Sequence, residues 1–133
     1  MNHLNININY QGINVDVQFN HIWNMLSGYS GTGKTFLMQA IKLFCMKHEI
    51  SCVYCDYNFL DKEIDQVKSF CKNAEVVLLD NADLYLTNEL FLWLKGSGKF
   101  LIVCMKDTSK IDMEDVAEYI VSYENRHITM EAY

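Results

Sequence analysis

Eight consecutive residues, 28–35, have the types and the spacing that hold phosphate groups. They read Gly-Tyr-Ser-Gly-Thr-Gly-Lys-Thr and fit the pattern G-x-x-x-x-G-K-[ST]. Glycines let successive backbone amides approach phosphate oxygens, and a helix that begins at the end of the loop adds free amides and the positive end of its dipole. The residues that we expect to bind the phosphates of a nucleotide are Gly28, Ser30, Gly31, Thr32, Gly33, Lys34 and Thr35.

Two residues of this loop have more specific chemistry. Lys34 would place its charge on the β- and γ-phosphates, and the Thr35 hydroxyl would be a ligand of Mg²⁺. The alternative is a glycine-rich turn that only begins a helix.

A carboxylate further along the chain fits the same site. Val76 to Leu79 are four consecutive apolar residues, typical of a buried parallel strand, and Asp80 follows them. The carboxyl ends of parallel strands meet at one edge of a sheet, where ligands bind in folds of this kind. We therefore expect Asp80 to complete the metal site with Thr35, directly or through water.

These two motifs resemble those of the P-loop NTPases, in the ATPase branch that includes AAA+ and RecA-like proteins. Residues 28–35 match the Walker A motif, and Val76 to Asp80 match Walker B. The resemblance implies binding of ATP with Mg²⁺. It also implies a catalytic Glu directly after Asp80, but Asn81 occupies that position. An amide orients water but cannot take its proton, so slow hydrolysis is expected.

Other polar residues are candidates for parts of this chemistry. Asp83 would supply the missing carboxylate, although a helix-capping role is the favoured interpretation. The resemblance implies a sensor of the γ-phosphate at the end of the strand Phe100–Met105, where a solvated loop is the alternative. The sensor candidates are Lys106, Asp107 and Thr108. Arg126, the only arginine, is either an arginine finger or an exposed turn residue.

A small kinase is the second enzyme class that the resemblance suggests. Asp56 follows the strand after the phosphate-loop helix, and an acidic group there would activate an acceptor hydroxyl. Kinases of this type commonly clamp the transferred group with several arginines, which this chain lacks. Asp56 at the plain end of a strand is the favoured alternative.

Alternating segments position these residues. Residues 22–26 and 51–56 read as strands, and apolar spacing predicts helices at 35–48, at 88–95 and around Leu60 to Cys71, the last capped by Asn58. Alternation of strands and helices implies a mostly parallel sheet with helices on both faces. Leu4–Tyr10 and Ile13–Phe19 predict an N-terminal β-hairpin, and residues 119–130 predict two antiparallel strands at the other end.

The composition limits the partners and the size. With 133 residues, one domain spanning 1–133 is expected, and the formal charge of −6 disfavours direct binding of nucleic acid. No apolar stretch approaches the ~20 residues that span a bilayer, so a cytoplasmic protein is expected. The five cysteines lack the spacing of a zinc site: Cys52 and Cys55 should point to opposite faces of a strand.

The sequence therefore predicts an α/β P-loop protein that binds ATP and Mg²⁺. Slow ATP hydrolysis is the primary hypothesis, with Lys34, Asn81 and Asp83 as catalytic candidates and Thr35 and Asp80 as metal ligands. A module that uses bound nucleotide to dock a protein partner or a second copy, without turnover, is the alternative from another class. ATP is preferred over GTP only because no N-K-x-D string appears.

Overall fold

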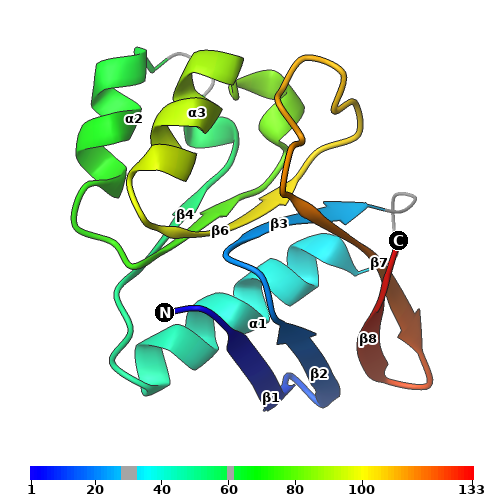
Figure 1. Ribbon diagram of the computed structural model, residues 1–133. Coiled ribbons are helices and arrows are strands. Elements are labelled where there is room, and N and C mark those ends of the chain that lie inside the picture. Colours follow the sequence, from blue (N-terminus) through cyan, green and yellow to red (C-terminus); the bar gives the residue numbers. More distant parts are fainter. Residues whose placement is uncertain (28–32, 60–61) are drawn as a thin grey trace.

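The computed structural model describes residues 1–27, 33–59 and 62–133. Its strands form one eight-stranded sheet in the order β1-β2-β8-β7-β3-β6-β5-β4 (Figure 1). The strands are β1 Leu4–Tyr10, β2 Ile13–Phe19, β3 Trp23–Ser27, β4 Cys52–Cys55, β5 Val76–Leu79, β6 Phe100–Cys104, β7 Ala117–Glu124 and β8 His127–Ala132. The helices are α1 Lys34–Lys47, α2 Ile64–Cys71 and α3 Asn88–Gly96, with 3₁₀ turns at Tyr57–Phe59 and Ala82–Leu84.

The sheet is mixed but mostly parallel. Parallel pairs join β4 to β5, β5 to β6, β6 to β3, β3 to β7 and β2 to β8. The β1–β2 and β7–β8 pairs are antiparallel. These pairings confirm the predicted α/β class, with its N-terminal hairpin and its C-terminal antiparallel pair.

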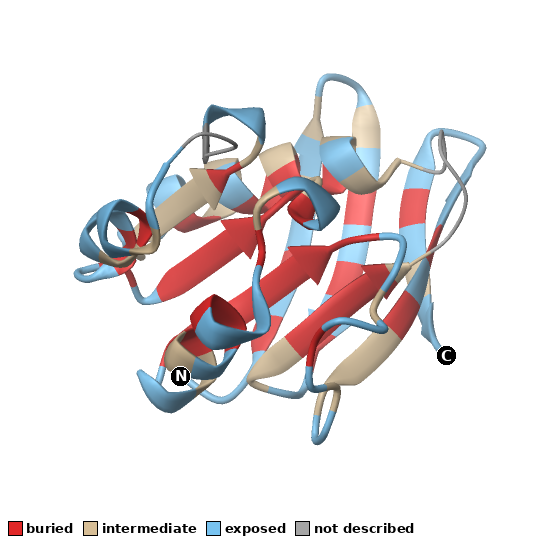
Figure 2. Ribbon diagram, turned by 90° about the horizontal axis from the view of Figure 1, so that it is seen from above, coloured by how far each residue is buried: buried red, intermediate tan, exposed pale blue. Residues whose placement is uncertain are grey.

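Helices cover both faces of the central strands. Alternate residues of β5 show this arrangement, because Leu78 belongs to the core under α1 and Leu79 to the core under α2 and α3. All four residues of β5 and all five of β6 are buried, as expected for strands between two helical layers (Figure 2). The continuous apolar runs in the sequence follow from this double coverage.

The outer strands curl around α1. In β1, buried Leu4 and Ile6 alternate with exposed Asn5 and Asn7, so only one face of the hairpin packs inward. The ring of Tyr10 at the end of β1 lies 5.0 Å from that of Phe36 in the first turn of α1. The hairpin therefore supports the start of the helix that follows the glycine-rich loop.

The start of α2 differs from the expectation. Asn58 lies in the 3₁₀ turn and does not cap the helix; Glu63 occupies the N-cap position and forms a capping box with Gln66. Leu60, which was expected on the buried face of this helix, lies outside the described residues. Among the described residues, no helix is both long and apolar enough to span a membrane.

Candidate functional site

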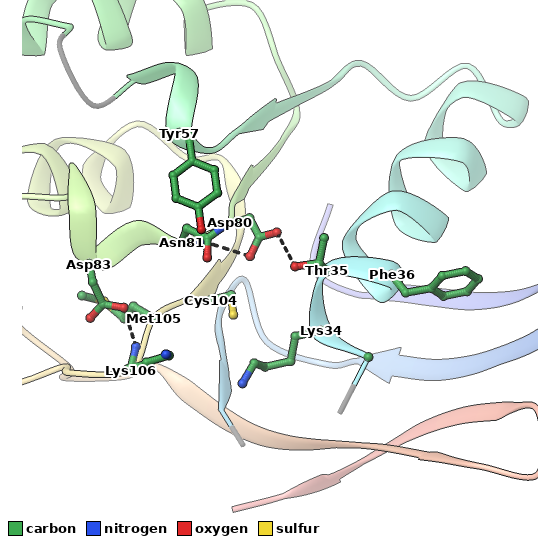
Figure 3. A pocket seen from close by; sticks show the side chains of 11 residues that line it. Lys34, Thr35, Phe36, Tyr57, Asp80, Asn81, Asp83, Cys104, Met105 and Lys106 are labelled. Atoms are coloured by element: carbon green, nitrogen blue, oxygen red, sulfur yellow. Dashed lines mark hydrogen bonds between the residues drawn. The ribbon is translucent and has the colours of Figure 1, made fainter. Parts of the chain in front are cut away.

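A pocket of about 450 Å³ opens where the central strands end and α1 begins (Figure 3). Residues from the start of α1, the segment after β4, the end of β5 and the end of β6 line it. The lining residues are Gly33, Lys34, Thr35, Phe36, Tyr57, Asp80, Asn81, Asp83, Cys104, Met105 and Lys106. The pocket thus brings together side chains that are far apart in the sequence.

The start of α1 lines the pocket. Gly33 is the N-cap residue with φ of 95°, and it makes no side-chain cap hydrogen bond. The Leu37 amide donates to the Gly33 carbonyl at 2.8 Å, so the helix ladder begins there. The first amides of a helix have no partner within it and favour an anion. Residues 28–32, which include predicted ligands Gly28, Ser30, Gly31 and Thr32, lie outside the described residues.

A hydrogen bond joins the two sequence motifs. The Thr35 hydroxyl donates to Asp80 Oδ2 at 2.9 Å (Figure 3). Asp80 follows β5 on the face that α1 covers, because it lies two positions beyond Leu78 on the same side of the strand. The first turn of α1 and the carboxyl end of β5 therefore meet at this pair.

Asp80 is held from two more directions. Its side chain is 1% exposed, Tyr54 donates its hydroxyl to Oδ2 at 2.7 Å, and the Asn81 amide donates to Oδ1 at 3.0 Å. Burial, followed by the hydrogen bond to Asp80, raises the pKa of Tyr54 well above its usual value, so this phenol stays protonated and remains a donor. Each Asp80 oxygen thus accepts at least one hydrogen bond that fixes its position.

Asn81 adopts a left-handed backbone conformation, with φ of 51° and ψ of 41°. Asn tolerates this region better than most residues, whereas Glu there is strained. The backbone gives a physical reason why an amide follows Asp80 here.

Asp83 binds the backbone at the end of β6. Its two oxygens accept hydrogen bonds from the amides of Lys106 at 2.7 Å and Asp107 at 2.9 Å. Asp83 lies inside the 3₁₀ turn that Asn81 begins. Through these two hydrogen bonds its carboxylate fixes the start of the loop after β6. Of the three sensor candidates, only Lys106 lines the pocket. The Asp107 carboxylate accepts from the side chain and the amide of Ser109, which lower its pKa.

Two further candidates lie apart from the pocket lining. The carboxylate of Asp56 accepts from the Asn58 amide at 3.3 Å, in a local turn after β4. Arg126 is exposed, with φ of 60°, in the turn between β7 and β8, and its carbonyl accepts from the Asn14 amide at 2.9 Å.

Sequence reasoning missed the aromatic and sulfur groups around Asp80. The Tyr85 hydroxyl contacts the carbonyls of Cys55 and Asp80 at 2.9 and 2.6 Å. Burial, followed by the negative charge of Asp80, raises the pKa of Cys104 to about 11. Tyr57 reaches the pocket from the 3₁₀ turn after β4 (Figure 3). Finding these residues requires knowing which strands are neighbours, because no local pattern marks them.

The cysteines lie on opposite faces of β4, as expected. Cys52 packs against the core under α1, and Cys55 belongs to the core under α2 and α3. Both thiols are free, as are those of Cys45, Cys71 and Cys104.

Solved structures share this fold. A DNA replication initiation factor superposes with a TM-score of 0.53 and 19% identity over 67% of this chain and 34% of its own. DnaA from Aquifex aeolicus bound to AMPPCP superposes with a TM-score of 0.52 and 18% identity. This match covers 68% of this chain and 35% of the DnaA chain. A chain from the complex of archaeal ribosomal stalk protein aP1 and archaeal ribosome recycling factor aABCE1 superposes with a TM-score of 0.54 and 15% identity. This match covers 98% of this chain and 38% of the other. No protein-family model and no curated protein matches the sequence.

At 15–19% identity, these likenesses show a shared α/β fold and nothing finer. The chain spans about a third of the length of each of the similar chains.

Proposed function

We propose that the chain binds a nucleoside triphosphate, with ATP preferred, together with Mg²⁺ in the pocket at the start of α1. Slow hydrolysis of the bound triphosphate is the activity that we attach to this site. Residues 1–133 would form one nucleotide-binding domain.

The hydrogen bond between Thr35 and Asp80 is the observation that carries the proposal. It places a hydroxyl and a carboxylate 2.9 Å apart at the start of a helix. Mg²⁺ prefers hard oxygen ligands and keeps several waters, so one hydroxyl and one nearby carboxylate fit its chemistry. When bound, Mg²⁺ would neutralise negative charge on the phosphates.

The charges of the lining residues support the same ligand. Lys34 and Lys106 line the pocket together with Asp80 and Asp83. The lysines suit phosphate oxygens, and Asp80 suits the metal ion that accompanies them. A protein of similar fold, DnaA from Aquifex aeolicus, is bound to the nucleotide analogue AMPPCP.

Removing the lysine charge tests nucleotide binding. We expect Lys34→Ala to weaken ATP binding about 10- to 100-fold, the usual effect of losing charge-assisted hydrogen bonds. Isothermal titration with ATP, GTP and ADP, with Mg²⁺ and with EDTA, measures this loss. Lys47→Ala, an exposed lysine in the last turn of the same helix, is the matched control and should bind as the wild type does. Wild-type protein that binds none of these nucleotides would refute the proposal.

An interaction module without turnover is the second candidate function. The left-handed Asn81 in place of a catalytic Glu favours it, as does Arg126, which lies apart from the pocket lining. In such a module, bound nucleotide would set the shape of a surface that docks a protein partner or a second copy.

Asn81→Asp separates the two candidates. Asp adds a carboxylate and tolerates the left-handed backbone better than Glu does. If Asn81 faces the attacking water, this variant should release phosphate about a hundredfold faster, the lower end of the range for a positioned base. Asn81→Gly keeps the backbone without a base and should show no gain. Tight nucleotide binding with no phosphate release from the wild type or from Asn81→Asp would favour the module.

A further inference from the structure

Tyr54 shares the strand face that carries the metal-side carboxylate. In the parallel pairing of β4 and β5, Tyr54 lies opposite Leu78, so the two side chains point to the same side. Asp80 is two residues beyond Leu78 and points to that side as well. The phenol ring packs against the core under α1, and its hydroxyl reaches Asp80 Oδ2 at 2.7 Å.

The hydrogen bond from Thr35 to Asp80 determines which side of the Thr35 hydroxyl is left for a cation. Oδ2 accepts from both Tyr54 and Thr35, and Oδ1 accepts from the Asn81 amide. The single proton of the Thr35 hydroxyl is therefore committed to the carboxylate. The lone pairs of Thr35 Oγ1 remain for a metal ion.

We propose that Tyr54 is a positioning residue of the Mg²⁺ site. Its hydroxyl anchors the Asp80 carboxylate, which in turn orients the Thr35 hydroxyl so that its oxygen faces the metal. Tyr54 would not touch the metal or the nucleotide; it acts through Asp80. This inference rests on the proposed nucleotide-binding function.

Burial explains why the Asp80 carboxylate needs the Tyr54 hydroxyl as a donor, in addition to the Thr35 hydroxyl and the Asn81 amide. A buried carboxylate that accepts too few hydrogen bonds is unfavourable, and Asp80 is 1% exposed. With two donors on Oδ2, rotation of the carboxylate would break two hydrogen bonds at once. The same rotation would misdirect Thr35, so the phenol stabilises the geometry needed by the metal.

The hydroxyl of Tyr54 is separable from its ring. Lys42 Nζ lies 5.9 Å from the ring centroid, a contact that a phenylalanine would retain. Tyr54→Phe therefore removes the hydroxyl that donates to Asp80 and leaves the packing of the ring in place. A purely structural hydroxyl would affect the melting temperature without affecting the response to Mg²⁺.

The experiment measures Mg²⁺ affinity and nucleotide affinity separately. A non-hydrolysable ATP analogue is bound to the protein in EDTA, and Mg²⁺ is then titrated in at a fixed analogue concentration. We expect Tyr54→Phe to bind the analogue in EDTA like the wild type. Its Mg²⁺ midpoint should rise about tenfold, the lower end of what loss of a residue behind a metal ligand costs.

Two controls identify the route of the effect. Tyr119→Phe removes another buried tyrosine hydroxyl in the same core, one that contacts His21 Nδ1 at 3.4 Å in place of Asp80. It should leave the Mg²⁺ midpoint unchanged. In an Asp80→Asn background, Tyr54→Phe should cause no additional shift, because the two residues act in series.

The outcomes distinguish this inference from the proposed function. A wild type that binds the analogue with Mg²⁺ dependence, together with Tyr54→Phe that has the same midpoint, overturns the role of Tyr54 alone. Equal shifts of the midpoint by Tyr54→Phe in both backgrounds also overturn it, because the effect would then bypass Asp80. A wild type that does not bind the analogue overturns the proposed function, and this inference with it.

Discussion

The two halves of the sheet are buried in different ways. Strands β3, β6, β5 and β4 lie between two layers of helices, and β5 and β6 are buried at every residue (Figure 2). Strands β1, β2, β8 and β7 form the outer half, where buried and exposed residues alternate along β1 and β2. The outer half covers α1 with one face only.

The two halves contribute differently to the pocket. The central half delivers Asp80, Asp83 and Lys106 to the pocket from its strand ends. The outer half places no described residue among the pocket lining, but it packs against the first turn of α1 through Tyr10 and Ile128. The central half therefore lines the pocket, and the outer half contacts the start of α1.

Substitutions at adjacent positions should respond differently in the two halves. In β5, Leu78→Ala and Leu79→Ala should each lower the free energy of unfolding by about 2–5 kcal/mol, because both side chains are buried, on opposite faces. In β1, Ile6→Ala should cause a loss in the same range, whereas Asn7→Ala should change stability by about 0.5 kcal/mol or less. Urea denaturation followed by circular dichroism measures all four.

The comparison fails if the alternation is absent. A large loss from Asn7→Ala would mean that the outer face of the hairpin is covered by something else. A small loss from Leu79→Ala would mean that the layer of α2 and α3 contributes little to the central strands.

The sequence predicted the elements better than their order in the sheet. Periodicity marked both hairpins and the central strands, because burial on one face or two leaves a local pattern. The parallel pairing of β2 with β8 could not be predicted, because it joins segments from opposite ends of the chain. At α2, Glu63 and Gln66 were a local capping signal that was overlooked in favour of Asn58.

The candidate site was predictable only where residues belong to a motif. Thr35 and Asp80 were paired because the carboxyl ends of parallel strands meet at one edge of a sheet, and they lie within hydrogen-bond distance. To predict the role of Tyr54, one must know that β4 and β5 are neighbours in the sheet. To predict the contact of Asp83 with the Lys106 amide, one must know that β5 and β6 are neighbours. The catalytic roles given to Lys34, Asn81 and Asp83 stay predictions.

A smaller coupling is predicted where β8 contacts the start of α1. A Cβ added at Gly33 would lie 3.3 Å from Ile128 Cδ1, and the φ of 95° is strained for any other residue. Gly33→Ala should therefore cost about 1–2 kcal/mol of stability from the backbone, plus a contact term. Ile128→Val removes the Cδ1 atom and should cost about 0.5–1.5 kcal/mol alone.

The double variant isolates the contact between Ile128 of β8 and Gly33 at the start of α1. Gly33→Ala with Ile128→Val should be more stable than the sum of the single losses by about 0.5 kcal/mol, because the touching methyl is gone. Gly12→Ala is the matched control: its φ is 79°, but no atom lies within 4 Å of the added Cβ, so it should show no coupling to Ile128→Val. Strict additivity at Gly33 in urea denaturation would mean that β8 does not constrain the start of α1. The outer half would then have to support the start of α1 through the contact of Tyr10 with Phe36 instead.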